Sequence, residues 1–366
     1  MTALRGVTRL LLLTPGVGGA DGISTLSRQY VQALSALARD AGATLEVWSL
    51  ADSARPDVLP RETAFSGAGG RRWRFAARSL TAAGIGRHTR VIVLHAHLLP
   101  VTLPLRLRGA RVVAVLIGVE VWGPIGHAVR CALRRAWRVL AISRATRDRF
   151  RDAHPELAGL EVRVCEPAAP VAWEMRSDVP APAEPWPPGP TALIVGRMAV
   201  DERYKGHDAL IEVWPEVRAQ VPDATLLVVG TGDDEVRLRQ KANALAGAGV
   251  RFTGMLPPAR LAAAYRESAF FAMPSSGEGF GLVYLEAMQM GKACLAAPGA
   301  AEEVVEDGVS GVIVDPADRP ALVLALVRLF TDVGWRDALG VAGRRIVQAR
   351  FTPAHLAARL GASLEV

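Results

Sequence analysis

Two glutamates frame a glycine-rich stretch in the second half of the chain. Seven residues separate Glu278 from Glu286, and the segment joins a strand predicted at 269–273 to a helix predicted from about Phe280 to Met290. Glycines let the backbone approach a ligand closely, and the N–H groups at the start of a helix favour an anion. Because a carboxylate repels phosphate, we expect both glutamates to accept hydrogen bonds from hydroxyl groups, with Glu286 about two turns into the helix. The segment therefore predicts a nucleotide-sugar site, and a solvated helix with its loop is the plainer alternative.

A second group of candidate residues precedes this segment by about 80 residues. Gly196 and Arg197 close a strand predicted at 191–195, and Lys205 stands just ahead of another predicted helix. The chain has only three lysines against forty arginines, so a lysine at this position is informative. An arginine fork and a lysine point charge can stabilise a departing diphosphate without a metal ion. An ordinary surface lysine is the alternative.

The charge of the chain is divided unevenly between its two halves. The length of 366 residues suits two or three domains, and the net charge of the whole chain is +7. Residues 1–170 hold twenty-four arginines and twelve acids, whereas residues 171–366 hold nineteen basic and twenty-four acidic residues. The stretch Arg71–Arg78 mixes arginines with aromatic residues, as an interfacial helix would, although a solvated helix face has the same pattern. We expect peripheral contact with an anionic membrane and, because no nucleic-acid-binding signature is present, no nucleic acid partner.

The cysteines and the apolar runs predict where the protein works. Cys131, Cys165 and Cys294 are isolated, which favours a reducing cytoplasm over a disulfide framework. The stretch Arg5–Ala20 imitates a signal peptide but reads better as a first strand. The run Val91–Leu105 is shorter than the roughly twenty residues that span a bilayer. Any membrane association is therefore expected to be peripheral, on the inner face of the cytoplasmic membrane.

Apolar runs alternate with amphipathic stretches along both halves of the chain, which predicts parallel sheets covered by helices. Eight of the twenty-five residues from Glu166 to Pro190 are proline, which predicts a linker. Two doubly wound domains would place their ligands in a cleft at the carboxyl edges of the strands. Strands are predicted at 9–13, 44–50, 90–95, 111–117 and 139–142, and then at 192–195, 225–229, 250–252, 269–273, 293–296 and 312–314.

A glycine loop follows the first predicted strand. Gly16–Gly22 imitates a dinucleotide fingerprint, with Asp52 as the acid that would bind a ribose. The spacing is irregular, and Asp52 follows the loop by about thirty residues instead of about twenty. We prefer the interpretation that Gly18 and Gly19 approach a phosphate from the first domain. A nicotinamide-dependent oxidoreductase remains the alternative.

Several segments together resemble glycosyltransferase family 4, whose members are retaining transferases of the two-domain GT-B fold. The resemblance covers nearly the whole chain and is most specific from Gly196 to Gly311. The segments that carry it are Gly196-Arg197 with Lys205-Gly206, Val229-Gly230-Thr231-Gly232, Phe252-Thr253-Gly254, Pro274-Ser275-Ser276, Glu278-Gly279-Phe280-Gly281-Leu282, Glu286-Ala287-Met288 and Gly308 to Gly311.

This resemblance implies two Rossmann-like doubly wound domains facing each other across a cleft. An acceptor-binding domain is expected at 1–170, a linker at 171–190, a nucleotide-sugar-binding domain at 191–345, and a C-terminal helix at 346–366 that could pack back on the first domain. The implied activity is transfer of a sugar from a nucleoside-diphosphate sugar to a hydroxyl acceptor, such as a sugar or a lipid-linked molecule, in bacterial polysaccharide or glycolipid biosynthesis. UDP, GDP and ADP donors fit the motifs equally well, and no cofactor or metal is implied.

The same resemblance assigns roles to individual residues. Arg197 and Lys205 would contact the donor diphosphate, Glu286 the ribose, and Glu278 the transferred sugar. Further donor contacts are implied for Gly196, Gly254, Met255, Gly279, Phe280, Gly281, Leu282, Gly18 and Gly19. Catalysis would involve Glu278, Arg197, Lys205 and His97.

One position departs from the pattern of the family. Many relatives carry a histidine beside the donor sugar where this chain has Ile117, which cannot donate a hydrogen bond from its side chain. His97 is a candidate substitute, and Glu120 and His97 are expected on the acceptor side. For retention we favour a same-face route, in which the departing phosphate oxygen accepts the proton of the acceptor.

Two other classes of protein fit parts of the sequence. His95 and His97 could belong to a metal-dependent hydrolase, although a zinc site needs a third protein ligand and none is evident from local spacing. A non-catalytic binding protein of the same fold gains some weight from Ile117.

Overall fold

The computed structural model describes residues 4–170, 187, 189–245 and 249–365. The chain divides into two compact units, here called unit 1 (Met1–Ala168 with Phe351–Val366) and unit 2 (Ala169–Arg350). This division falls two residues before the domain boundary expected after residue 170. Most of the expected linker at 171–190 lies outside the described residues.

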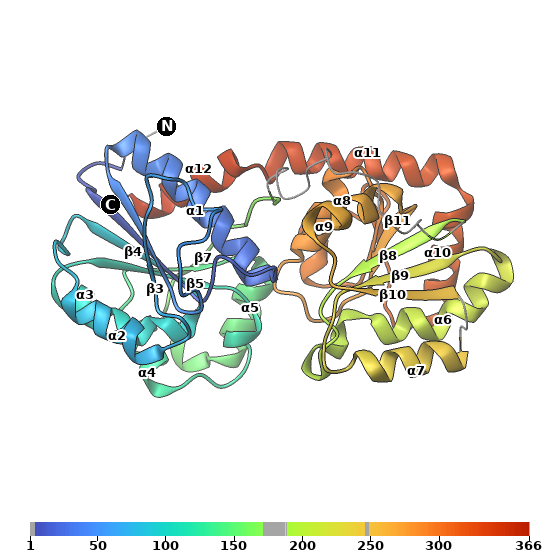
Figure 1. Cartoon of the computed structure of the whole chain (residues 1–366), viewed down its shortest axis with the longest axis horizontal. Helices are drawn as coiled ribbons and strands as arrows, with labels where there is room; N and C mark the ends of the chain where they lie inside the picture. The colour runs from blue at the N-terminus through green and yellow to red at the C-terminus, as the bar shows by residue number, and fades with distance from the viewer. Residues whose placement is uncertain (1–3, 171–186, 188, 246–248, 366) are drawn as a thin grey trace. The chain divides into compact units, whose positions relative to one another are not determined.

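Unit 1 is built on a parallel sheet of seven strands in the order β3-β2-β1-β4-β5-β6-β7. Helices cover both faces of this sheet, with α1 (Gly22–Ala41) and α12 (Pro353–Leu364) on one side and α2 (Arg72–Thr81) and α3 (Leu103–Leu107) on the other (Figure 1). The strands are β1 (Arg9–Thr14), β2 (Thr44–Ser49), β3 (Ala64–Gly67), β4 (Thr89–Leu94), β5 (Arg111–Leu116), β6 (Arg138–Ala141) and β7 (Val162–Val164). The remaining helices are η1 (Ala96–Thr102), η2 (Val119–Val121), α4 (His127–Leu133), α5 (Arg144–Ala153) and η3 (Pro155–Leu157).

Unit 2 repeats this architecture with a parallel sheet of six strands in the order β10-β9-β8-β11-β12-β13. Helices α6 and α7 lie on one side of the sheet, and α8 and α9 on the other (Figure 1). The strands are β8 (Thr191–Val195), β9 (Thr225–Val229), β10 (Val250–Gly254), β11 (Phe270–Met273), β12 (Cys294–Ala296) and β13 (Gly311–Ile313). The helices are η5 (Val200–Lys205), α6 (His207–Gln220), α7 (Glu235–Leu245), α8 (Pro258–Glu267), α9 (Leu282–Gln289), η7 (Ala300–Glu303), α10 (Arg319–Thr331) and α11 (Val333–Arg350).

Central strands were predictable because both of their faces are buried. Every residue of β4 and β9 is buried, and most of each strand is a continuous apolar run in the sequence, Val91–Leu94 and Leu226–Val229. The short strands β3 and β7 were not predicted. Both lie at edges of the sheet of unit 1 and are only partly buried, which removes the apolar signal.

The C-terminal segment returns to unit 1. Thr352 caps α12 by accepting a hydrogen bond from the His355 N–H, and the helix packs against α1. Arg359 forms an ion pair with Glu166, with 3.1 Å between the charged atoms. Helix α11 belongs to unit 2 as far as Arg350, so the segment that returns begins at Phe351 and not at residue 346 as expected.

Both sheets reverse their winding direction at one point. In unit 1 the reversal lies between β1 and β4, and in unit 2 between β8 and β11. Ligands of doubly wound sheets bind at the carboxyl ends of the strands at such a reversal. The Gly16–Gly22 loop and His95 follow the first pair of strands, and Arg197 and the 274–278 segment follow the second.

None of the helices in the described part of the chain combines the length and the apolar character needed to cross a membrane.

Candidate functional site

The carboxyl end of β8 carries two cations that share one acid. Arg197 donates from Nε to Glu202 Oε2 at 3.1 Å, and Lys205 Nζ lies 3.0 Å from the same oxygen. Burial raises the pKa of Glu202, but the hydrogen bond from Arg197 and the charge of Lys205 outweigh it, so the pKa lies below its ordinary value. The Arg197 side chain is 62% exposed and can turn toward a ligand. Glu202 was not identified as a site residue from the sequence. Its position three residues before Lys205 is the one sequence signal that could have indicated this ion pair.

Segment η5 is held against the residues that follow β11. The N–H of Ser276 donates to the carbonyl of Tyr204 at 3.0 Å. A Cβ atom on Gly277 would lie 2.5 Å from the Tyr204 ring, and Gly206 adopts φ +87° beside the carbonyl of Pro274. Any side chain at Gly277 would push the two segments apart. These glycines therefore bring Lys205 close to the segment that contains Glu278.

Glu278 lies in this assembly as a partly buried acid. Ser275 donates a hydrogen bond to Glu278 Oε1 at 3.1 Å. Burial raises the pKa of Glu278, and the nearby Glu202 acts in the same direction. The charge of Lys205 and the Ser275 hydrogen bond lower that pKa without cancelling the rise. Arg197, Lys205 and Glu278 are thus brought together, as predicted.

Glu286 lies on α9 with its orientation fixed by a buried phenol. Tyr265 donates from its hydroxyl to Glu286 Oε2 at 2.7 Å, and the Tyr265 ring is fully buried. An ionised carboxylate accepts several hydrogen bonds on its two oxygens, so Glu286 can bind the phenol and a ligand hydroxyl at the same time. Tyr265 is a second residue that sequence reasoning missed, since nothing in the motif marks it.

The glycine-rich turn begins the helix later than predicted. Gly281 has φ +89°, which a right-handed helix does not accept, so α9 starts at Leu282 instead of Phe280. Glu286 is therefore the fifth helical residue and lies closer to the helix start than the predicted two turns. A Cβ on Gly281 would lie 2.4 Å from the Tyr284 ring, which explains why glycine is needed.

The remaining donor candidates of unit 2 occupy the same edge of the sheet. Gly196 approaches β9 so closely that a Cβ on Gly230 would lie 2.0 Å from the Gly196 carbonyl oxygen. Phe280 is 2% exposed, so it offers a ligand main-chain groups and not its ring. Gly279 and Leu282 flank the turn, and Gly254 and the 60% exposed Met255 lie at the end of β10.

The glycine loop of unit 1 is held by its own side chains. The N–H groups of Val17 and Gly18 donate to the Asp52 carboxylate at 2.8 and 3.1 Å. Arg28 donates to the carbonyls of Val17 and Gly19 at 2.8 and 2.7 Å. Asp52 therefore stabilises this loop, which argues against its role as the ribose-binding acid of a nicotinamide site.

Strained backbone and a perturbed acid lie at the ends of β4 and β5. His95 has φ +115°, the one positive φ of a non-glycine residue among those described. Burial and the neighbouring His97 lower the pKa of His95 to about 4. Glu120 accepts a hydrogen bond from the Ile117 N–H at 2.7 Å, and burial raises the pKa of Glu120 to about 7. His97 is exposed, so unit 1 offers at this edge an exposed imidazole and a carboxyl group whose pKa is about 7.

The histidine pair lacks the companions of a metal site. Across residues 4–170, 187, 189–245 and 249–365, no group of three or more His, Cys, Asp or Glu side chains is arranged to hold a metal ion. His95 Nδ1 instead accepts a hydrogen bond from the His97 N–H at 3.3 Å. The donor set expected for a metal-dependent hydrolase is therefore missing from the described residues.

Residues 189–332 match the family model described as glycosyl transferases group 1. The chain is 35% identical over 258 residues to a GDP-mannose-dependent alpha-(1-6)-phosphatidylinositol monomannoside mannosyltransferase of Mycolicibacterium smegmatis, covering 65% of this chain and 66% of the relative. A protein of the same description from Mycobacterium tuberculosis is 33% identical, with 70% of each chain covered. A phosphatidyl-myo-inositol mannosyltransferase of Mycolicibacterium smegmatis is 37% identical, covering 39% of this chain and 37% of the relative. The alignments thus span between 37% and 70% of the lengths of these relatives.

Solved structures match nearly the full length of the chain. A sucrose-phosphate synthase from Thermosynechococcus elongatus has a TM-score of 0.70 at 23% identity, covering 97% of this chain and 98% of that protein. The HepE protein of Anabaena in complex with UDP and glucose has a TM-score of 0.74 at 18% identity, covering 98% and 99%. These likenesses and the two parallel sheets confirm the predicted GT-B fold class. With relatives above 30% identity, the chain belongs to the group 1 glycosyl transferases.

Proposed function

We propose that the protein transfers a sugar from GDP-mannose to a hydroxyl group of a lipid-linked acceptor, with retention of anomeric configuration and without a metal ion. The observation that carries this proposal is the pair of cations, Arg197 and Lys205, held beside Glu278 at the reversal point of the sheet of unit 2. The relatives named as GDP-mannose-dependent mannosyltransferases support the choice of donor. The donor base and sugar could not be chosen from the sequence alone.

In this proposal, different site residues bind the diphosphate, the ribose and the mannosyl group of the donor. The diphosphate lies against Arg197 and Lys205 and displaces their shared contact with Glu202. The ribose hydroxyls bind Glu286, whose carboxylate is oriented by Tyr265. The mannosyl group meets Glu278 and the main chain of the 279–282 turn. Cationic groups that meet charge developing on the leaving phosphate stabilise the transition state more than the ground state.

The proposed route to retention uses the same residues. We expect the phosphate oxygen that leaves the anomeric carbon to accept the proton of the attacking hydroxyl on the same face of the sugar. Arg197 and Lys205 hold the charge of that phosphate while the bond breaks. His97 and Glu120, at the edge of unit 1, are candidates for contacts with the acceptor.

Contact with an anionic membrane is proposed for one face of unit 1. Helices α2 and α3 expose Trp73, Leu80 and Leu107 to 66%, 62% and 76%. Arg108 joins the two helices by donating to the Ser79 carbonyl at 2.9 Å. Exposed apolar side chains beside arginines favour the interface of an anionic bilayer. We propose that the enzyme works in the cytoplasm, on the inner face of the membrane, where it would meet a lipid-linked acceptor.

The test of the donor is hydrolysis of GDP-mannose, GDP-glucose, UDP-glucose and ADP-glucose by the purified protein without an acceptor. GDP-mannose should be consumed fastest, and mannose should be released first as the α anomer by NMR. Hydrolysis of none of the four, with no binding of their nucleoside diphosphates, would contradict the proposed function.

The test of membrane contact is flotation with vesicles that contain an anionic phospholipid. The Trp73→Ala variant should float less than the wild type, whereas the Trp335→Ala variant, changed in unit 2, should float like the wild type. Equal flotation of all three proteins would argue against α2 as the contact.

A further inference from the structure

Segment η5, which carries Glu202 and Lys205, is bound along its length to the loop between β9 and α7. The Met198 N–H donates to the Thr231 carbonyl at 3.0 Å, and the Asp234 N–H donates to the Met198 carbonyl at 2.9 Å. A Cβ on Gly232 would lie 1.9 Å from the Met198 carbonyl oxygen, so glycine is required for this approach. The β9–α7 loop therefore supports the whole stretch from the end of β8 into η5.

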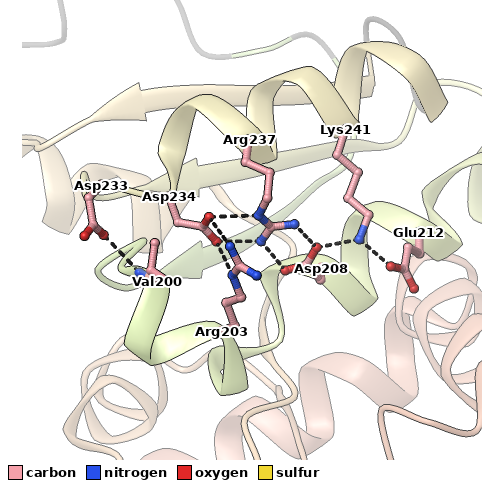
Figure 2. Close-up of polar contacts among 8 residues, drawn as sticks. All are labelled: Val200, Arg203, Asp208, Glu212, Asp233, Asp234, Arg237 and Lys241. Carbon is pink, nitrogen blue, oxygen red and sulfur yellow. Dashed lines mark hydrogen bonds and ion pairs between the residues drawn. The ribbon is translucent and has the colours of Figure 1, made fainter.

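Two side chains of that loop bind η5 directly. Asp233 accepts a hydrogen bond from the Val200 N–H at 2.9 Å (Figure 2). Asp234 accepts two from Arg203, from Nε at 3.0 Å and from Nη2 at 2.9 Å. The second contact is a bidentate fork, the strongest and most directional form of an ion pair between side chains. Asp234 is thus the main side-chain link between η5 and α7.

Asp234 is itself held by a second arginine. Arg237, one turn along α7, donates from Nε to Asp234 Oδ1 at 2.8 Å, so the carboxylate lies between two guanidinium groups (Figure 2). The Asp234 side chain is 4% exposed, and Arg237 and Arg203 hold its pKa well below the usual range. The carboxylate therefore remains ionised and oriented across the pH range in which the enzyme works.

The ion pairs continue away from η5 toward α6. Arg237 forms a second fork with Asp208, with both distances 2.7 Å, and Lys241 pairs with Asp208 and Glu212 (Figure 2). The network has one end at η5 and one end between α6 and α7. Lys241 is at the far end, which makes it a natural control position.

A short 3₁₀ helix needs such support. η5 has six residues, and Glu202 departs from helical geometry with φ −117° and ψ 24°. A helix of this length is not stable by itself, since its few internal hydrogen bonds do not compensate for the ordering of its backbone. The contacts with Asp233, Asp234 and the 274–277 segment fix its shape before any ligand arrives.

We propose that Arg203 and Asp234 are a positioning pair that fixes η5 in the shape in which Arg197 and Lys205 receive a diphosphate. This inference rests on the proposed function. Arg203 directs its Nε and Nη2 atoms at Asp234, so it acts on the ligand through η5 and not by contact. Loss of the pair lets η5 move, and a displacement of about 1 Å in a binding group weakens the recognition of a charged ligand severalfold or more.

The test measures the dissociation constant of GDP by isothermal titration calorimetry. Arg203→Met and Asp234→Asn should each weaken GDP binding by about five- to thirtyfold, and the double variant should be no weaker than the worse single variant, because both remove one link. Lys241→Met breaks only the far end of the network and should bind GDP like the wild type. Arg203→Lys, which restores a charge without the fork, should recover part of the loss. The melting temperature of each variant separates lost stability from lost binding.

Several results would overturn the proposal. If Arg203→Met binds GDP as tightly as the wild type, Arg203 does not position η5 for diphosphate binding. Equal losses in Lys241→Met and Arg203→Met would show a general loss of stability. Additive losses in the double variant would mean that Arg203 contacts GDP itself. Failure of the wild type to bind any nucleoside diphosphate contradicts the proposed function instead, so the two failures are distinct.

Discussion

The two units equip the reversal points of their sheets in different ways. In unit 2 the site is charged and open, because Arg197 is 62% exposed and shares Glu202 with Lys205. In unit 1 two amides of the glycine loop donate to Asp52, and two of its carbonyls accept from Arg28. Unit 2 thus presents charged side chains that a ligand can bind, whereas the glycine loop of unit 1 presents backbone held by side chains. The difference suggests that unit 2 supplies the electrostatic part of catalysis and that unit 1 supplies shape.

The largest effect should come from removing a cation of unit 2. Arg197→Ala or Lys205→Ala should lower kcat for donor hydrolysis about 100- to 1000-fold, since the charge on the leaving diphosphate loses a stabilising partner. Steady-state kinetics with GDP-mannose provide the measurement. Arg319→Ala, which removes an ion pair with Glu216 elsewhere in unit 2, should leave kcat unchanged. If the Arg197 and Lys205 variants turn over like the wild type, these cations do not stabilise the leaving diphosphate, and the electrostatic role assigned to unit 2 is wrong.

A smaller effect, on stability, should come from the perturbed acid of unit 1. The pKa of Glu120 is about 7 in the folded protein and near 4.5 when unfolded, so the folded state favours the protonated form. The contribution of Glu120 to stability is therefore greatest below pH 4.5 and is lost as the pH rises through 7. Glu120→Gln is neutral at every pH, so its advantage over the wild type should grow by about 2 kcal/mol between pH 5 and pH 8.

Urea unfolding at the two pH values measures this difference. A difference between the Glu120→Gln variant and the wild type that does not change with pH would mean that Glu120 titrates normally in the folded state. Burial would then not perturb the acid at the edge of unit 1, and this part of the comparison would fail.

A change in the glycine loop of unit 1 should have a smaller effect, and we expect that effect on donor binding. Asp52→Asn keeps one acceptor for the Val17 and Gly18 amides but loses the charge, so the loop becomes less ordered. We expect the donor KM to rise about tenfold with little change in kcat, which corresponds to about 1.4 kcal/mol. The control is Asp57→Asn, an exposed aspartate of the same region. An unchanged KM in Asp52→Asn would place the loop outside the donor site.

The smallest effect should come from backbone strain at His95. Glycine accepts φ +115° and alanine does not, so His95→Gly should be about 1 kcal/mol more stable than His95→Ala. At His97, within η1, the order should be reversed, because a helical backbone favours alanine. Urea midpoints compare the two pairs of variants. If alanine at position 95 is as stable as glycine, the strain attributed to unit 1 is absent.

The sequence revealed much of the fold because buried parallel strands leave continuous apolar runs. The central strands of both sheets were found to within one or two residues, whereas the edge strands β3 and β7 gave no such signal. The start of α9 was placed two residues early, because Gly281 adopts a left-handed conformation and the helix begins only after it. A glycine in the sequence permits such a conformation but does not show at which residue of a glycine-rich turn it occurs.

The same limit applies to the site. Arg197, Lys205, Glu278 and Glu286 were chosen from the sequence because they belong to short segments of recognisable spacing. Their partners come from distant segments or carry no motif of their own. Tyr265 reaches Glu286 from α8 and was not marked by any motif. Asp52 was noticed in the sequence as a ribose-binding acid, but it binds the amides of the glycine loop instead. Candidate ligand residues were thus easier to select from the sequence than the residues that hold them in place.

The most direct test of the account is a crystal structure of the protein with GDP. We expect the diphosphate between Arg197 and Lys205, Glu202 released from at least one of them, and a ribose hydroxyl within hydrogen-bond distance of Glu286. A GDP molecule that binds away from Arg197, Lys205 and Glu286 would contradict the account.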